Sequence, residues 1–264
     1  MLQHNIFQKK HRAQNIQRLV GQAIGDYGLI RNHDRILVAL SGGKDSWTLL
    51  HILERLRERA PISFSLVAVT IHPGFPGFET GPLEACLTER KFEHHIVHEP
   101  INHVLQKLKL DGVPCSLCSR IRRGALYTQA RLLGCTKIAL GHHREDFIET
   151  LLLNMFYNGS IKAMSPLFVP DDGKTPVIRP LVYVSEDVIA GYADSAGFPR
   201  VISSCPDKRA QERKRVQIKK MLQDLEQQHP GIKANLLASL GRVDRRHLLE
   251  KRERENIAET FLEK

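Results

Sequence analysis

Several features are scarce or missing in this chain of 264 residues. Aromatic side chains make up only 6% of it, and its five cysteines are too few and too scattered for a disulfide-rich secreted scaffold. The sequence has no run approaching about 18 apolar residues, the length needed to span a bilayer, and no apolar leader at its start. These absences predict a cytoplasmic protein with no membrane partner.

Acidic residues are also in deficit. Against 39 Lys and Arg there are 29 Asp and Glu, which gives a formal net charge of +10. Because an excess of positive charge favours anionic partners, nucleic acid is the first candidate. Hydrophobic residues make up 42% of the chain, enough for a buried core, so a disordered or collagen-like chain is excluded.

Short apolar runs alternate with longer segments of helical periodicity. We expect strands at residues 35–40, 64–71, 93–98, 137–140 and 176–181. We expect helices at residues 15–24, 46–58, 82–90, 116–133, 145–157 and 185–196. This alternation predicts an α/β fold with a doubly wound, mostly parallel sheet, an N-terminal helix and a C-terminal helical tail.

The length suits one α/β domain with appendages or two small domains. We divide the chain into an N-terminal helical segment at 1–34, an α/β domain at 35–200 and a basic C-terminal helical segment at 201–264. Helical spacing predicts that Met155 faces the core with its apolar neighbours, and that Val216 helps to pack the basic tail.

The first expected strand ends in a loop that suits phosphate. Its sequence is Ser41-Gly42-Gly43-Lys44-Asp45-Ser46. Two glycines let backbone N–H groups approach a ligand, and the helix N-terminus and Lys44 both attract negative charge. The serine hydroxyls can donate, while Asp45 can hold Mg²⁺ or cap the helix. We expect Lys44 and Asp45 to be exposed. The Walker A spacing is absent, and an ordinary capped turn is the alternative.

Cys115 and Cys118 are three residues apart at an expected helix start, so both thiolates can face one side. Such a pair can hold zinc, form a redox pair or bind an iron–sulfur cluster. Cys205 is the other cysteine in a suitable place, and His142 can complete a zinc site. Three cysteines with an open fourth position suit a cluster that binds an additional sulfur.

Other residues carry weaker signals. Cys86 and Cys135 have apolar neighbours and are expected only to pack. Four arginines, Arg120, Arg122, Arg123 and Arg131, recur on the expected helix at 116–133. Because arginine binds phosphate through two hydrogen bonds, an RNA contact is one interpretation, and a solvated helix face is the other.

The sequence resembles a known family at three motifs. The loop Ser41-Gly42-Gly43-Lys44-Asp45-Ser46 matches the SGGxDS loop of the PP-loop ATP pyrophosphatases. The segments 115–124, 141–146 and 153–159 are similar to those of the tRNA 2-thiocytidine synthetase family. This resemblance implies the adenine nucleotide alpha hydrolase-like fold, with residues 35–200 as the PP-loop ATP-binding domain.

The resemblance also implies an activity. ATP, with Mg²⁺, activates the C2 oxygen of cytidine 32 in tRNA, and sulfur replaces it. A four-iron four-sulfur cluster on three cysteines carries the sulfide. Cys115 and Cys118 match the family motif, and Cys205 is the candidate for the third ligand because the family's usual second Cys-x-x-Cys run is absent.

The remaining site residues and partners come from the same resemblance. Gly141 and His142 are expected at the nucleotide, with Asp146 near them. Asp45 and the three cysteines are the expected catalytic residues. The expected partners are tRNA and a cysteine desulfurase or another sulfur donor, and a homodimer is a candidate assembly.

Three alternative functions are open. A PP-loop tRNA thiolase without a cluster would use a persulfide or disulfide between Cys205 and Cys115 or Cys118. A ligase resembling lysidine synthetase would need no cysteines. A zinc-stabilised RNA-binding protein would need no intact phosphate loop.

Overall fold

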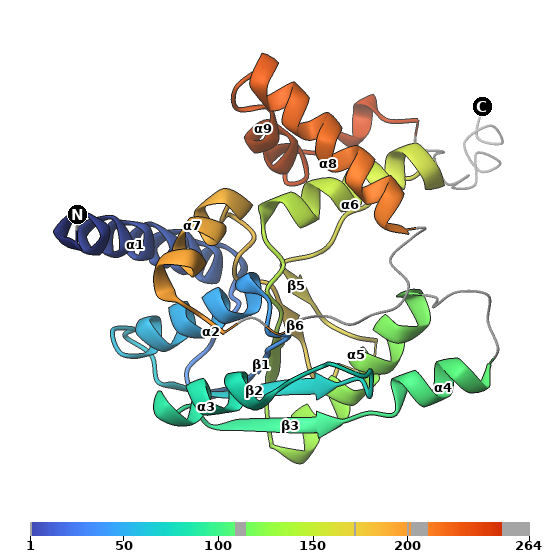
Figure 1. Ribbon diagram of the computed structural model, residues 1–264. Coiled ribbons are helices and arrows are strands. Elements are labelled where there is room, and N and C mark those ends of the chain that lie inside the picture. Colours follow the sequence, from blue (N-terminus) through green and yellow to red (C-terminus); the bar gives the residue numbers. More distant parts are fainter. Residues whose placement is uncertain (1, 109–114, 172, 200, 202–210, 250–264) are drawn as a thin grey trace, which may run out of the picture.

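The computed structural model describes residues 2–108, 115–171, 173–199, 201 and 211–249. Within these residues, six strands form one sheet in the order β3-β2-β1-β4-β6-β5 (Figure 1). The strands are β1 (Asp34–Ala39), β2 (Phe64–His72), β3 (His94–His98), β4 (Lys137–Ala139), β5 (Leu167–Phe168) and β6 (Val177–Ile178). All neighbouring pairs are parallel except β5 with β6. The prediction of a mostly parallel α/β sheet is therefore confirmed.

Helices cover both faces of the sheet. They are α1 (Leu2–Tyr27), α2 (Lys44–Arg57), α3 (Gly81–Glu89), α4 (Ile101–Lys107), α5 (Cys115–Leu132), α6 (Arg144–Asn158), α7 (Glu186–Ala196), α8 (Gln211–Gln228) and α9 (Ile232–Ser239), followed by a 3-10 turn at Arg245–His247. Side chains alternate along β1, so Ile36 and Val38 join the core formed with α1, α2 and α7. Leu37 joins the opposite core, beneath α5. The helices α8 and α9 lie over α6 (Figure 1).

The order of the strands reverses between β1 and β4. From β1 the chain passes to β2 and β3 on one side of the sheet, and later enters β4 on the other side of β1. In open parallel sheets, ligands bind beyond the carboxyl ends of the strands at such a reversal. The loops that follow β1 and β4 therefore mark the position of the candidate site.

Several expected elements differ from the structure. The N-terminal helix begins at Leu2 and ends at Tyr27, well beyond the expected 15–24. The last parallel strand is only Val177–Ile178, because the chain turns at Pro180, which has no N–H to donate to a ladder. The sequence analysis missed α4 and the short antiparallel β5.

Two residues expected to be buried are exposed. Met155 is 43% exposed in the last turn of α6, which the described residues leave largely uncovered. Val216 is 62% exposed, whereas Ile218 and Leu222 of α8 pack against α6. Residues two apart on a helix lie on nearly opposite faces, so burial of Ile218 turns Val216 outward. No helix of the described ranges is long and apolar enough to cross a membrane.

Candidate nucleotide-binding and catalytic site

The loop after β1 turns sharply into α2. Gly42 is buried and has a φ of +79°, and a Cβ there would lie 2.4 Å from the Cγ2 atom of Val201. Gly43 is the N-cap of α2. The Ser46 hydroxyl donates to the Gly43 carbonyl at 3.0 Å and accepts from the Ser41 N–H at 3.2 Å. These contacts fix the unpaired N–H groups of the helix N-terminus, which suit a phosphate group.

The loop after β4 lies directly against the start of α2. A Cβ at Gly141 would lie 3.0 Å from the backbone nitrogen of Ser46 and 3.1 Å from the carbonyl carbon of Asp45. Only a glycine permits this approach without displacing backbone atoms. The structure therefore brings two of the predicted site segments, 41–46 and 141–146, into contact at the strand-order reversal.

Lys44 is not exposed in an open loop, as the sequence analysis expected. It is the first residue of α2, and its side chain is 27% exposed. Its Nζ atom lies 3.0 Å from Asp45 and 3.3 Å from Glu186 of α7. Partial burial alone would lower the pKa of Lys44, but these two carboxylates raise it. Asp45, at 29% exposure, is likewise partly enclosed. Lys44 thus stays charged at the mouth of the phosphate loop.

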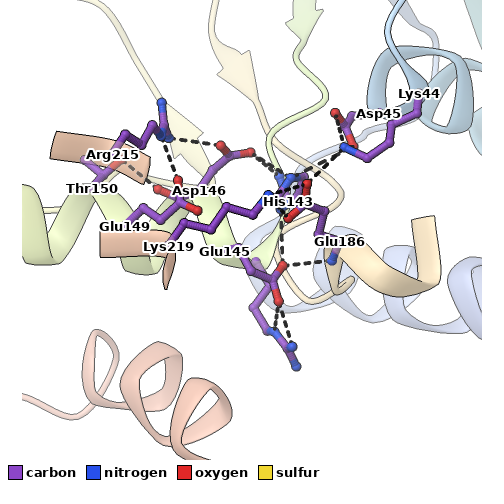
Figure 2. Close-up of polar contacts among 11 residues, drawn as sticks. Lys44, Asp45, His143, Glu145, Asp146, Glu149, Thr150, Glu186, Arg215 and Lys219 are labelled. Atoms are coloured by element: carbon purple, nitrogen blue, oxygen red, sulfur yellow. Dashed lines mark hydrogen bonds and ion pairs between the residues drawn. The ribbon is translucent and has the colours of Figure 1, made fainter. Parts of the chain in front are cut away.

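His143, the N-cap of α6, is surrounded by carboxylates (Figure 2). Its ring nitrogens lie 3.2 Å from Glu145, 3.5 Å from Asp146 and 3.9 Å from Asp45. Burial alone would lower the pKa of His143, but these carboxylates raise it. The His143 N–H also donates to the Asp146 carboxylate at 3.0 Å, which holds that side chain at the helix start.

Glu145 is buried and connects three elements. It accepts a hydrogen bond from the Glu186 N–H at 2.8 Å and from the Arg144 guanidinium at 2.8 Å. Burial would raise the pKa of Glu145, but hydrogen bonds from His143 and Arg144 lower it to about 2. Glu145 is therefore an ionised structural link between the start of α6 and α7.

The helix α8 contributes two cations to the site (Figure 2). Arg215 contacts Asp146 at 3.0 Å and Glu149 at 2.7 Å, while Lys219 lies 2.6 Å from Glu186. Burial raises the pKa of Glu149, and the Arg215 guanidinium partly offsets that effect. The basic C-terminal helix thus directs part of its charge toward the site and not toward solvent.

His142 points away from this cluster and lines a cavity of about 320 Å³ on the α5 side of the sheet. Its Nδ1 atom is buried and has no hydrogen-bond partner among the described residues. Burial lowers the pKa of His142 to about 4, and the nearby Arg179 and Arg215 charges add to this effect. His142 is therefore a neutral imidazole at physiological pH.

The cysteines fall partly within the described chain. Cys118 is half-buried and packs with Phe75, Ile101 and Leu105. Cys115 is the first residue of α5, but its side chain and the whole of Cys205 lie outside the described residues. Consequently, the three-cysteine ligand set stays a prediction.

Cys135 is buried, and burial raises the pKa of its thiol. Cys86 is partly buried against the main core. Both contacts agree with the packing role expected for these two cysteines.

Sequence reasoning missed several residues of the site. His143 and Glu145 lie inside the motif that it singled out, so their proximity to Asp146 was a usable signal. Glu186 and Arg215 gave no local signal, because they come from elements far along the chain. The exposed Arg120, Arg123 and Arg131 face outward from α5, as an RNA contact or a solvated face would require.

The sheet, the strand-order reversal and the loop at the N-terminus of α2 define an α/β protein of the PP-loop class. A family model described as a PP-loop domain matches residues 8–224. The chain is 50% identical over 242 residues to the tRNA-cytidine(32) 2-sulfurtransferase of Geobacter sulfurreducens, covering 90% of this chain and 93% of the relative. It is 47% identical over 236 residues to that of Syntrophotalea carbinolica, covering 89% and 91%.

These matches identify the chain as a member of the tRNA-cytidine(32) 2-sulfurtransferase family of PP-loop proteins, as the motifs indicated. Among solved structures, the U34-tRNA thiolase NcsA from Methanococcus maripaludis with its [4Fe-4S] cluster has a TM-score of 0.71 at 24% identity. That match covers 89% of this chain and 79% of the thiolase, and it shows a common fold.

Proposed function

We propose that this protein is an ATP-dependent tRNA-cytidine(32) 2-sulfurtransferase, which replaces the C2 oxygen of cytidine 32 in tRNA with sulfur. The observation that carries the proposal is the contact between the loop after β1 and the loop after β4 at the strand-order reversal. Relatives of this name match about nine-tenths of the chain.

The phosphate loop has the groups that cytidine activation by ATP needs. The C2 oxygen attacks the α-phosphorus, pyrophosphate leaves, and sulfide then displaces AMP from C2. The N–H groups at the start of α2 and the Lys44 ammonium bind the departing pyrophosphate. Asp45 supplies carboxylate oxygens, the ligands that Mg²⁺ prefers, beside those phosphates. Gly141 holds the second loop close enough for His142 and Asp146 to flank the same site.

The start of α5 has the chemistry of an iron–sulfur site. Cys115 and Cys118 lie one helical turn apart, and thiolates are the ligands of such clusters. The helix has no Asp or Glu from 116 to 131, and Arg120, Arg122 and Arg123 favour an anionic group. A four-iron four-sulfur cluster on three cysteines supplies an iron with an open position for the transferred sulfide.

Cys205 is the third ligand in this proposal. The described chain before it ends at Val201, which lies against Gly42 of the phosphate loop, with the Val201 N–H donating to the Gly42 carbonyl at 3.3 Å. This contact supports a ligand delivered to the site by the segment that follows α7.

The proposed partners are tRNA and a sulfur donor, either a cysteine desulfurase or another sulfide carrier, in the cytoplasm. A positive net charge of +10 supports the tRNA partner. A homodimer is the proposed assembly.

The first test compares Lys44→Ala and Asp45→Ala with Lys107→Ala, an exposed control on α4. Thiolation of a tRNA transcript and ATP affinity should both collapse in the first two variants. The melting temperature without ATP should change little, because partly exposed ion pairs contribute about 1 kcal/mol or less. Normal thiolation in either variant would remove the phosphate-loop assignment.

The second test measures iron, sulfide and thiolation in anaerobically purified Cys115→Ala, Cys118→Ala and Cys205→Ala. All three quantities should fall together in each variant, while Cys86→Ala retains them. Iron-free, active wild type with only two essential cysteines would indicate a persulfide mechanism instead. Stoichiometric zinc without colour would indicate a structural zinc site.

A further inference from the structure

A cavity lies between α5 and the β5–β6 hairpin, beside the carboxyl end of β4. Its volume is about 320 Å³, at the lower end of the range of about 300–1,000 Å³ that is typical of small-molecule pockets. Leu126 and Tyr127 of α5 and Leu140 give it apolar and aromatic walls, and Phe168 also lines it. A cavity of this size and lining suits one flat heterocyclic group.

The polar groups of this cavity are incompletely satisfied. The Nδ1 atom of His142 and the Nε atom of Arg179 are both buried, and neither has a hydrogen-bond partner among the described residues. Arg179 donates from Nη1 to the Ser165 carbonyl at 2.6 Å, which fixes the guanidinium beside the cavity. Buried polar groups are nearly always hydrogen-bonded in native proteins, so two such atoms at one cavity indicate a ligand with both donors and acceptors.

The cavity adjoins a second hollow of about 500 Å³ that carries positive charge. Arg123, Tyr127 and Phe168 line both, so the two are continuous. The outer hollow extends to Arg131 and Lys174, with Asp171 as its acidic member. Phe168 is 46% exposed where the two meet. Arginines outside and a neutral imidazole inside match a nucleotide with its base inward and its phosphates outward.

The position of the cavity relative to the phosphate loop fits the same ligand. His142 follows Gly141, the residue that packs against the first turn of α2. A base held at His142 therefore lies beside the segment that the proposed reaction uses to bind pyrophosphate.

We infer that this cavity, here called the base pocket, receives one unstacked cytosine of the tRNA, with Arg179 and His142 at its polar edge and Phe168 against its face. The phosphates on either side of that nucleotide lie along Arg123 and Arg131. The inference rests on the proposed function and specifies where the reacting nucleotide binds.

The hydrogen-bonding pattern favours cytosine over uracil. Cytosine presents two acceptors, O2 and N3, next to an amine, so a guanidinium can donate to the acceptors while a neutral imidazole accepts from the amine. Uracil has an N–H at ring position 3, which opposes a guanidinium donor. Phosphate contacts along Arg123 and Arg131 position the chain without distinguishing bases.

The test uses full-length protein, ATP and tRNA transcripts with cytidine or uridine at position 32. The variants are Phe168→Ala, Arg179→Gln and His142→Phe. The matched controls are Val243→Ala and Arg59→Gln, both exposed and far from the base pocket in sequence. KM for tRNA, kcat and ATP affinity are measured for each. A transcript with 5-iodocytidine at position 32 is also photocrosslinked, and the crosslinked peptide is mapped.

Loss of the stacking contact in Phe168→Ala should raise KM for tRNA about 5- to 150-fold, with ATP affinity within about twofold of wild type. Arg179→Gln and His142→Phe should reduce the preference for the cytidine transcript in competition binding. The iodocytidine crosslink should map to the Phe168 peptide. The controls should behave as wild type.

Failure of the inference and failure of the proposed function are distinguishable. If wild type thiolates the transcript but Phe168→Ala retains its KM and the crosslink maps elsewhere, the base pocket is wrong and the proposed function stands. If wild type does not thiolate cytidine 32 at all, the proposed function fails. Phe168 is partly exposed, so its variant tests the proposal even if Arg179→Gln does not fold.

Discussion

The contact between Gly141 and the first turn of α2 makes a strong prediction for Gly141→Ala. The added Cβ would lie 3.0–3.2 Å from three backbone atoms of Asp45 and Ser46, closer than the usual carbon contact distance of about 3.5–4.0 Å. Because backbone atoms cannot rotate away as a side chain can, the loop after β4 or the start of α2 must move. Overpacking of this kind costs about 1–3 kcal/mol, which lowers the melting temperature by about 2–12 °C.

The loss of ATP binding should exceed the loss of stability. The atoms that must move belong to the turn that donates to phosphate, and one hydrogen bond to a charged group is worth about 1.5–3 kcal/mol. ATP affinity should therefore fall about 10- to 150-fold. Calorimetric titration with ATP and thermal unfolding of the same samples measure the two effects separately.

Gly21→Ala is the matched control. Gly21 lies within α1 with no atom within 4 Å of an added Cβ, so alanine there should stabilise the helix by about 0.5–1 kcal/mol and leave ATP affinity unchanged. If Gly141→Ala binds ATP as tightly as Gly21→Ala does, the close approach of the two loops is not what shapes the phosphate site.

Three further predictions concern charge. The pKa of Glu145 is about 2 against an ordinary 4.5, so its stabilisation is complete above pH 4.5 and is lost as pH falls toward 2. Urea unfolding should show a loss of about 3 kcal/mol across that window, and Glu145→Gln should flatten it. Asp34 and Lys137 form a buried pair at 2.6 Å, so Asp34→Ala should cost about 3–5 kcal/mol, whereas adding Lys137→Met should recover part of it; additive losses would contradict the pairing. Replacing the exposed Lys214 and Lys220 with Gln should reduce the salt dependence of tRNA binding by about 0.7–0.9 per phosphate contact, and an unchanged slope would leave this face of α8 to solvent.

The sequence alone determined the local chemistry and the class of fold. Alternating short apolar runs and helical periods predicted the parallel sheet, since the spacing of buried side chains is a local property of strands and helices. Gly42 and Gly43 between a buried strand and a helix predicted the phosphate loop, because few other residues allow that backbone path. Cys115 and Cys118 were found in the same way, from their spacing on one helical turn.

Only the tertiary structure decided which distant groups meet. Lys44 pairs with Glu186, 142 residues away in the chain, and Arg215 reaches Asp146 across 69 residues. Neither pairing has a local signal, because any surface lysine or arginine satisfies the same pattern and only the packing of α7 and α8 selects its partner. The exposure of Val216 was decided likewise, by the side of α8 that meets α6. The strand-order reversal that joins the two loops is a property of the whole sheet, and no single segment encodes it.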